Sequence, residues 1–268
     1  MQADIGFIGA GNMGSALARA VCKSKGGAAV VISDHDGAKA ARVAAELGCA
    51  VGDNDAIAAS CSVIFLGVKP QMMPGMLAGL APTLAKREDR VLLVSMAAGL
   101  STARIRELAG VDCPIIRVMP NTPAAVGGGV LLYCGLDATD EELARFAAMM
   151  APAGLVDLLP EPLIDAATAV SGCGPAFVYL FIEALADGGV ACGLPRDKAL
   201  AYAAQMVEGS ALMVLQSGQH PGALKDAVCS PGGSTIQGVR ALEAHGFRSA
   251  AMEAVTAAYE KTVELGKN

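Results

Sequence analysis

Residues 5–14 read IGFIGAGNMG, and this stretch decides the fold. A short apolar run typical of a buried strand leads into Gly9, Gly11 and Gly14, which form the pattern GxGxxG at the start of a helix. In this pattern the first glycine suits a tight turn, the second lets the backbone approach a pyrophosphate, and the third permits close helix–strand packing. The N–H groups of the helix N-terminus favour a phosphate. The stretch therefore predicts a dinucleotide site.

An acidic residue follows the glycine pattern at a suitable distance. Asp34 ends the next apolar run, about 20 residues further along the chain. An acid here suits the ribose 2′-hydroxyl of NAD and repels a 2′-phosphate, whereas Ser33 and His35 could accommodate that phosphate. The sequence therefore leaves NADPH and NADH both open as the cofactor.

Apolar runs alternate with helical patterns through the first part of the chain. We expect strands at residues 5–8, 30–33, 63–68, 91–95, 115–119, 130–133 and 155–159. We expect helices between them at residues 14–25, 38–47, 71–85 and 140–150. This alternation predicts an α/β domain with a Rossmann-type, doubly wound and mostly parallel sheet.

The strand signals stop near residue 160. The remainder predicts helices at residues 175–192, 196–217, 221–228, 236–244 and 248–265, with wide apolar surfaces. We therefore expect a dinucleotide-binding domain over residues 1–160 and an all-α dimerisation and substrate domain over residues 161–268. Residues 166–182 carry no charge, but Gly172, Gly174 and Pro175 interrupt them, which favours an interface helix over a membrane span.

Composition argues against several classes of function. A net charge of −6 argues against a nucleic-acid partner, and 53% hydrophobic residues favour a homo-oligomer. The eight cysteines form no CxxC pair and there are only three histidines, so we expect no metal site. The N-terminus lacks a basic segment, which favours a cytoplasmic protein with no membrane association.

Polar and small residues follow three later strands of the expected sheet. These segments are Val68-Lys69-Pro70, Ser95-Met96-Ala97-Ala98-Gly99 and Met119-Pro120-Asn121-Thr122-Pro123. Ligands of open α/β sheets lie beyond the carboxyl ends of the strands. The three segments therefore predict the remaining walls of a cofactor cleft.

A second glycine-rich loop lies in the helical half. Residues 229–238 read CSPGGSTIQG, with a helix expected on each side. Gly232 and Gly233 leave backbone N–H groups accessible, and the following helix contributes its positive end, so the loop predicts a site for a small carboxylate. Acid–base groups are few, which favours reduction of a C=N bond, where a protonated imine already carries its proton.

The chain resembles the pyrroline-5-carboxylate reductase family over essentially its whole length. The most specific stretch is residues 221–243, PGALKDAVCSPGGSTIQGVRALE. Supporting segments are FIGAGNMGSAL, GVKPQ, VSMAAG, RVMPNTP, SGCGPAF and DGGVACGLPR.

The resemblance implies reduction of 1-pyrroline-5-carboxylate to L-proline with NADPH or NADH, in proline biosynthesis. It implies dimers that often assemble further, in which the substrate loop meets the cofactor of the partner subunit. Implied cofactor residues are Ile8, Gly9, Gly11, Asn12, Met13, Gly14, Ser33, Asp34, Asn54, Val68, Lys69, Pro70, Met96, Ala97 and Ala98. Implied substrate residues are Ser230, Pro231, Gly232, Gly233, Ser234 and Thr235, with Thr235 as the catalytic residue near the ring nitrogen.

The chain departs from the family pattern at two places, and two alternative functions remain open. Many bacterial members have Asn-Arg where this chain has Asp34-His35, and Cys173 stands where serine is usual. One alternative is another imine or 3-hydroxyacid oxidoreductase, although residues 171–179 lack the lysine expected of a 3-hydroxyacid dehydrogenase. The other is a non-catalytic NAD(P)-binding sensor, which leaves the loop Ser230–Thr235 without a role.

Overall fold

The computed structural model describes residues 3–266 and divides into two compact units. Residues 174–257 form the second unit, and the rest of the chain, including the end of the last helix, forms the first. This division follows contacts within the chain. The predicted domain boundary between residues 160 and 161 stays a prediction.

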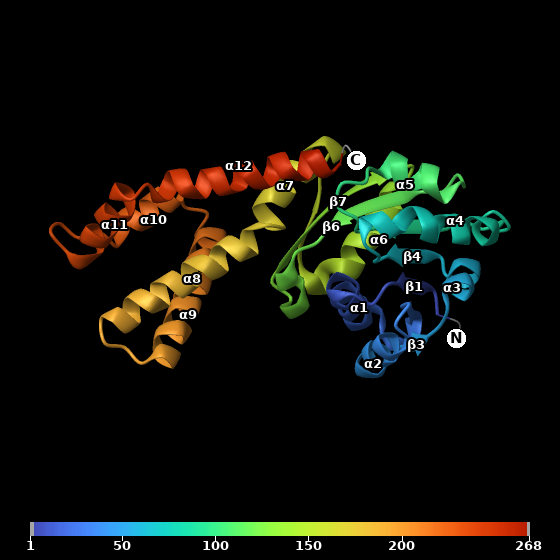
Figure 1. The fold of residues 1–268 in the computed structure, drawn as a ribbon, viewed down its shortest axis with the longest axis horizontal. Helices are drawn as coiled ribbons and strands as arrows, with labels where there is room; N and C mark the ends of the chain where they lie inside the picture. Colours follow the sequence, from blue (N-terminus) through green and yellow to red (C-terminus); the bar gives the residue numbers. More distant parts are fainter. Residues whose placement is uncertain (1–2, 267–268) are drawn as a thin grey trace. The chain divides into compact units, whose positions relative to one another are not determined.

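The first unit is built on an eight-stranded sheet in the order β3-β2-β1-β4-β5-β6-β7-β8 (Figure 1). The strands are β1 Ile5–Ile8, β2 Val30–Ser33, β3 Ala50–Val51, β4 Val63–Leu66, β5 Leu92–Ser95, β6 Ile115–Met119, β7 Gly129–Leu136 and β8 Gly154–Leu158. Neighbouring strands are parallel except for β6 and β7. Only the short 3-10 helix Thr122–Val126 connects β6 to β7, and so short a connection cannot return the chain for a parallel pairing.

Alternate residues of the central strands face two separate cores. In β4, Val63 and Phe65 contribute to one core and Ile64 and Leu66 to the other. On the first face, Phe65 stacks on Phe7 of β1 with ring centroids 4.3 Å apart. The helices α1 Asn12–Lys25, α2 Gly37–Leu47 and α6 Asp140–Met150 supply residues to the first core. The helices α3 Asn54–Ser60, α4 Met73–Leu84 and α5 Thr102–Ala109 supply residues to the second.

The structure confirms most of the predicted elements and adds short ones. The strands at 5–8, 30–33 and 115–119 and the helix at 140–150 have the predicted bounds. The strand predicted at 63–68 ends at Leu66. Strand β3, helices α3 and α5, and helix α7 Glu161–Ser171 were not predicted. Helices α3 and α5 are short, but each begins after a side chain that caps it, Asp53 and Ser101 respectively.

A buried arginine ties α7 to the sheet. Arg117 on β6 is 4% exposed, and its Nη2 lies 2.6 Å from Asp165 Oδ1 while its Nη1 lies 3.5 Å from Glu161 Oε1. Glu161 also accepts hydrogen bonds from the backbone N–H and the hydroxyl of Thr102, each at 2.8 Å. At the other end of α7, the Asn121 amide donates to the Ser171 carbonyl at 3.0 Å.

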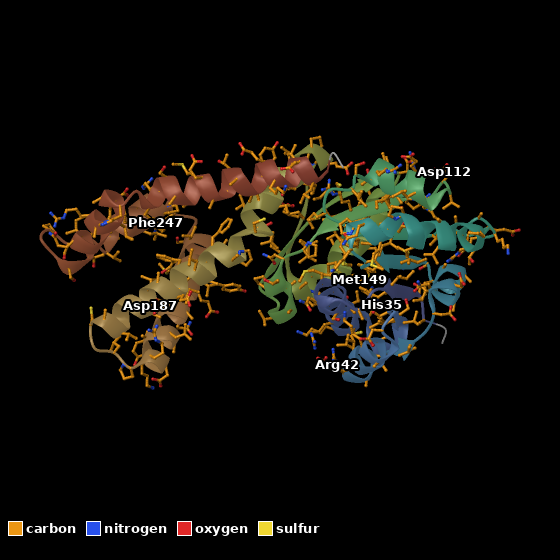
Figure 2. All side chains as sticks on the ribbon, viewed as in Figure 1. His35, Arg42, Asp112, Met149, Asp187 and Phe247 are labelled. Atoms are coloured by element: carbon orange, nitrogen blue, oxygen red, sulfur yellow. The ribbon has the colours of Figure 1, made fainter. Side chains whose placement is uncertain are left out.

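The second unit is helical. Its elements are α8 Gly174–Ala191, α9 Arg196–Ser217, α10 Pro221–Ala227, α11 Ser234–Ala244 and most of α12 Phe247–Leu265. Helices α8 and α9 pack through a small core centred on Ala186, Ala199 and Ala203. Phe247, labelled in Figure 2, packs against Phe181 of α8 with ring centroids 5.5 Å apart.

Many large apolar side chains of the second unit are exposed within one chain. On α8 and α9 these are Val178, Tyr179, Leu180, Leu200, Tyr202, Met206, Leu212, Met213, Val214 and Leu215. The helical stretch Glu161–Ala191 is also long and apolar enough to cross a membrane by length and composition alone, although α7 ends at Ser171 and α8 begins at Gly174. So large an exposed apolar surface indicates a surface that is covered by something else.

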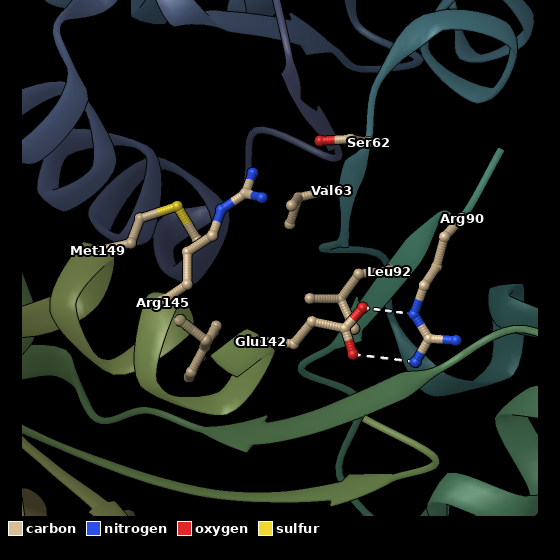
Figure 3. A pocket seen from close by; sticks show the side chains of 8 residues that line it. Ser62, Val63, Arg90, Leu92, Glu142, Arg145 and Met149 are labelled. Atoms are coloured by element: carbon tan, nitrogen blue, oxygen red, sulfur yellow. Dashed lines mark hydrogen bonds and ion pairs between the residues drawn. The ribbon is translucent and has the colours of Figure 1, made fainter. Parts of the chain in front are cut away.

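A small cavity of about 200 Å³ lies at the amino ends of β4 and β5, away from the carboxyl ends of the strands. Figure 3 shows the Arg90 guanidinium bridging both oxygens of Glu142, at 2.6 and 3.0 Å. These hydrogen bonds from Arg90, helped by the Thr139 backbone N–H and opposed by burial, lower the pKa of Glu142 to about 2. The pair therefore favours the carboxylate form.

We expect Glu142 to make stability depend on pH in acid. Its folded pKa is lowered from 4.5, so its contribution is complete above about pH 5 and is lost as the pH falls towards 2. Because Arg90 is half exposed, solvent screening reduces this contribution to about 1 kcal/mol. Glu142→Gln keeps the hydrogen bond that caps α6, so its free energy of unfolding should fall less between pH 5 and 2.5. Urea titrations of both proteins measure the difference, and parallel pH curves would contradict it.

Candidate active site

A cavity of about 720 Å³ lies at the carboxyl ends of β1, β2 and β4. It is lined by Ile8, Gly9, Gly11, Asp34, His35, Lys39, Asn54, Gly67, Val68, Lys69, Gln71, Met72, Gly75 and Met76. Strands β2 and β3 follow β1 on one side of it, and the chain then crosses back to place β4 on the other side, so this is the point where the strand order reverses. Ligands of doubly wound folds bind at this point.

The glycine loop is shaped for a close approach to the backbone. Gly9 has φ +108°, and a Cβ there would lie 2.5 Å from the Gly67 carbonyl oxygen. Gly11 has φ −65° and ψ −179°, and a Cβ there would meet no atom within 4 Å. No side chain caps the N-terminus of α1, so its first N–H groups remain available to an anion. The loop therefore fits a pyrophosphate.

Two polar side chains at the end of β2 are fixed by hydrogen bonds. The Asp34 carboxylate accepts from the Ala10 N–H at 2.7 Å, which joins the end of β2 to the glycine loop. The hydroxyl of Ser33, 3% exposed, donates to Asn54 Oδ1 at 2.6 Å. Ser33 thus lies beneath the cavity and orients Asn54, which lines it.

The structure brings together about half of the predicted cofactor residues. Those that line the cavity are Ile8, Gly9, Gly11, Asp34, Asn54, Val68 and Lys69. Asn12, Met13 and Gly14 form the first turn of α1, and Pro70 begins the 3-10 helix Pro70–Met72. Met96, Ala97 and Ala98 follow β5 and do not line this cavity.

Several lining residues were not among the predicted set. They are His35, Lys39, Gly67, Gln71, Met72, Gly75 and Met76. The spacing of Met72 and Met76 is that of one helix face, so the helical pattern after Val68-Lys69-Pro70 carried a signal for them. Lys39 lies in the first turn of α2, and its Nζ is 3.8 Å from Oδ2 of Asp34 at the end of β2.

The loop after β5 lies against the end of the last helix. Gly99 has φ +77°, and a Cβ there would lie 3.3 Å from the backbone of Gly266. Two features favour glycine at this position: the neighbouring backbone leaves little room for a side chain, and the positive φ is a conformation that other residues rarely adopt. Residues 96–98 therefore precede a loop whose shape is set by close backbone packing.

The second glycine-rich loop forms a tight turn before α11. The N–H of Gly233 donates to the Ser230 carbonyl at 3.0 Å, and Gly232 has φ +71°. No side chain caps α11, so the N–H groups of Ser234 and Thr235 lie in an uncapped first turn. Five of the six predicted substrate residues are exposed, namely Ser230, Pro231, Gly232, Ser234 and Thr235. The loop belongs to the second unit and the cavity to the first.

Known proteins match both parts of the chain. The sequence model described as "Pyrroline-5-carboxylate reductase dimerisation" matches residues 161–265, and the one described as "NADP oxidoreductase coenzyme F420-dependent" matches residues 4–99. A pyrroline-5-carboxylate reductase of Glycine max is 44% identical over 265 residues, covering 97% of this chain and 95% of its own length. The chain belongs to the pyrroline-5-carboxylate reductase family. The reductase of Escherichia coli (strain K12) is 41% identical, and the match covers 100% of both chains.

Solved structures agree with this family. The pyrroline carboxylate reductase of Plasmodium falciparum, solved with NADP bound, is 34% identical with a TM-score of 0.86 over 99% of both chains. A pyrroline-5-carboxylate reductase of Coxiella burnetii is 29% identical with a TM-score of 0.89 over the same share. The predicted fold, a Rossmann-type domain followed by a helical dimerisation domain, is therefore confirmed, as is the predicted family. As a member of this reductase family, the chain is an NAD(P)H-dependent oxidoreductase acting on a CH–NH bond.

Proposed function

We propose that this protein reduces the C=N bond of 1-pyrroline-5-carboxylate to give L-proline, with Gly11 and the start of α1 holding the cofactor. The observation that carries the proposal is the open space at Gly11, at the uncapped N-terminus of α1 and on the wall of a cavity of about 720 Å³. A volume of this size suits a cofactor. NAD(P)H, when bound, supplies the hydride. Family membership over the full chain supports the substrate.

The loop Ser230–Thr235 holds the substrate in this proposal. Its uncapped N–H groups at the start of α11 carry the partial positive charge of the helix N-terminus, which binds the substrate carboxylate. The Thr235 hydroxyl hydrogen-bonds the ring nitrogen and fixes the ring for attack at the neighbouring carbon. The protonated imine already carries the proton that the product amine keeps, so no separate acid is required at this step.

Thr235→Ala should lower kcat/KM by about ten- to a hundred-fold, because one hydrogen bond to a polar or charged group is lost. Purified protein is mixed with pyrroline-5-carboxylate and NADH or NADPH, and the absorbance of the reduced nicotinamide is followed. Thr235→Ser keeps the hydroxyl and should recover most of the activity. Thr256→Ala is the matched control, because Thr256 is an exposed threonine on α12 whose hydroxyl donates to the Met252 carbonyl of its own helix. Unchanged kcat/KM in Thr235→Ala would remove the role of this hydroxyl.

We further propose a cytoplasmic homo-oligomer built from dimers. The exposed apolar residues of α8 and α9, among them Leu180 and Leu215, support the dimer, because a second copy would remove them from water. The dimerisation family model over residues 161–265 supports it as well. In the dimer, the loop Ser230–Thr235 of one subunit meets the cofactor of its partner. Light scattering on protein eluting from a size-exclusion column measures the mass of the assembly. A monomer at micromolar concentration that retains full activity would overturn the proposal.

A further inference from the structure

The end of β2 carries a carboxylate that is held in place from two sides. Asp34 Oδ2 accepts the Ala10 N–H at 2.7 Å, and Asp34 Oδ1 accepts the Asp36 N–H at 3.0 Å. The side chain is only 5% exposed, although it lines the cofactor cavity. A carboxylate has about four lone-pair positions, and the two backbone N–H groups take one on each oxygen. Asp34 therefore presents a fixed acceptor to the cavity.

The surroundings keep this carboxylate charged. Burial raises the pKa of Asp34, but the backbone N–H groups of Asp36 and Ala10, together with Lys39 and His35, outweigh burial and leave the pKa below its usual value. His35 Nδ1 lies 2.9 Å from Asp34 Oδ1, and Lys39 Nζ lies 3.8 Å from Asp34 Oδ2. The two basic side chains beside Asp34 thus already face its charge.

The Ser33 hydroxyl, also at the end of β2, already has a hydrogen-bond partner. Ser33 is 3% exposed and donates its proton to Asn54 Oδ1 at 2.6 Å, so it does not offer a donor to a phosphate in the cavity. Lys69, the other basic residue of the cavity wall, follows β4 rather than β2. A 2′-phosphate placed at the end of β2 would therefore meet a fixed negative charge that Lys39 already faces at 3.8 Å.

We propose that Asp34 is a specificity-determining residue that makes this chain bind NADH more tightly than NADPH, by accepting a hydrogen bond from the ribose 2′-hydroxyl. The inference rests on the proposed function in one respect, that the cavity holds a nicotinamide dinucleotide. Turning the carboxylate aside to admit a 2′-phosphate would break its bond to Ala10 and release the glycine loop. The bond between Asp34 and the loop therefore makes the preference difficult to reverse without loss of the pyrophosphate site.

The test is equilibrium binding of NADH and of NADPH to the full chain, without substrate, followed by calorimetry or by fluorescence of the reduced nicotinamide. The wild-type Kd for NADH should be about tenfold or more below that for NADPH, as expected for one charge-assisted hydrogen bond gained or one repulsion added. Asp34→Asn should shift the ratio of the two constants about tenfold towards NADPH.

Asp36→Asn is the matched control. It removes the same charge two residues away, where Asp36 caps α2 and does not line the cavity, so the ratio should change by less than about threefold. A wild-type protein that binds NADPH as tightly as NADH, or an unchanged ratio in Asp34→Asn, would overturn the inference and leave the proposed function intact. A wild-type protein that binds neither dinucleotide would remove the proposed function itself.

Discussion

Gly11→Ala should weaken cofactor binding by about a hundredfold or more while leaving the melting temperature within about 1 °C. The backbone at Gly11 has φ −65°, which alanine adopts without strain, and a Cβ there meets no atom of residues 3–266 within 4 Å. The new methyl group would instead occupy the space through which a pyrophosphate approaches the start of α1. Binding of NADH and NADPH, measured beside a thermal melt, separates the two effects.

Gly14 provides the contrast. A Cβ at Gly14 would lie 2.1 Å from the Gly9 carbonyl oxygen, so Gly14→Ala must displace the backbone of the loop. We expect this variant to lose both cofactor affinity and melting temperature, as helix α1 moves away from β1. If Gly11→Ala were to bind the cofactor with wild-type affinity, the glycine loop would not be the pyrophosphate site.

Arg117→Met should lower the free energy of unfolding by about 3 kcal/mol. The arginine is buried, and its removal leaves the carboxylates of Glu161 and Asp165 close together without their cation. The value lies at the lower end of the range for buried pairs because both carboxylates are 30% exposed and partly hydrated. Urea denaturation measures the change.

Two further variants show whether charge or packing is responsible. The combined variant Arg117→Met, Glu161→Gln, Asp165→Asn should regain much of the loss, because no uncompensated charge remains. Arg104→Met removes an exposed arginine paired with Glu107 one helical turn away on α5, and should cost less than about 0.5 kcal/mol. Equal losses in Arg104→Met and Arg117→Met would contradict an effect of burial.

The central strands and the glycine loop could be predicted because their signals are local. The runs at 5–8 and 115–119 are apolar throughout, as expected for strands covered on both faces, and GxGxxG needs only its neighbours in sequence. The two-residue strand β3 and the short helices α3 and α5 are too short to produce a period. Their capping residues, Asp53 and Ser101, were the available signal.

The cavity wall was harder to predict because it depends on contacts between distant segments. The hydrogen bond from the Ala10 N–H to Asp34 spans 24 residues, and no local pattern indicates that it fixes the carboxylate. The burial of Ser33 against Asn54 is likewise tertiary, and it directs the Ser33 hydroxyl to the Asn54 side chain. Local pattern thus located the site, whereas the orientation of its polar groups required the folded chain.

The reversed direction of β7 decides where the chain leaves the sheet. Because β7 runs from the carboxyl edge to the amino edge, α6 returns the chain, β8 descends beside β7, and α7 ascends again to end at Ser171. The bond from Asn121, which follows β6, places that end at the carboxyl edge. Had β7 and β8 kept the direction of the other strands, the last crossover would have delivered the chain to the opposite rim. One antiparallel pairing thus brings the end of α7, the last helix before the second unit, to the same edge of the sheet as the cavity lined by Gly9 and Asp34.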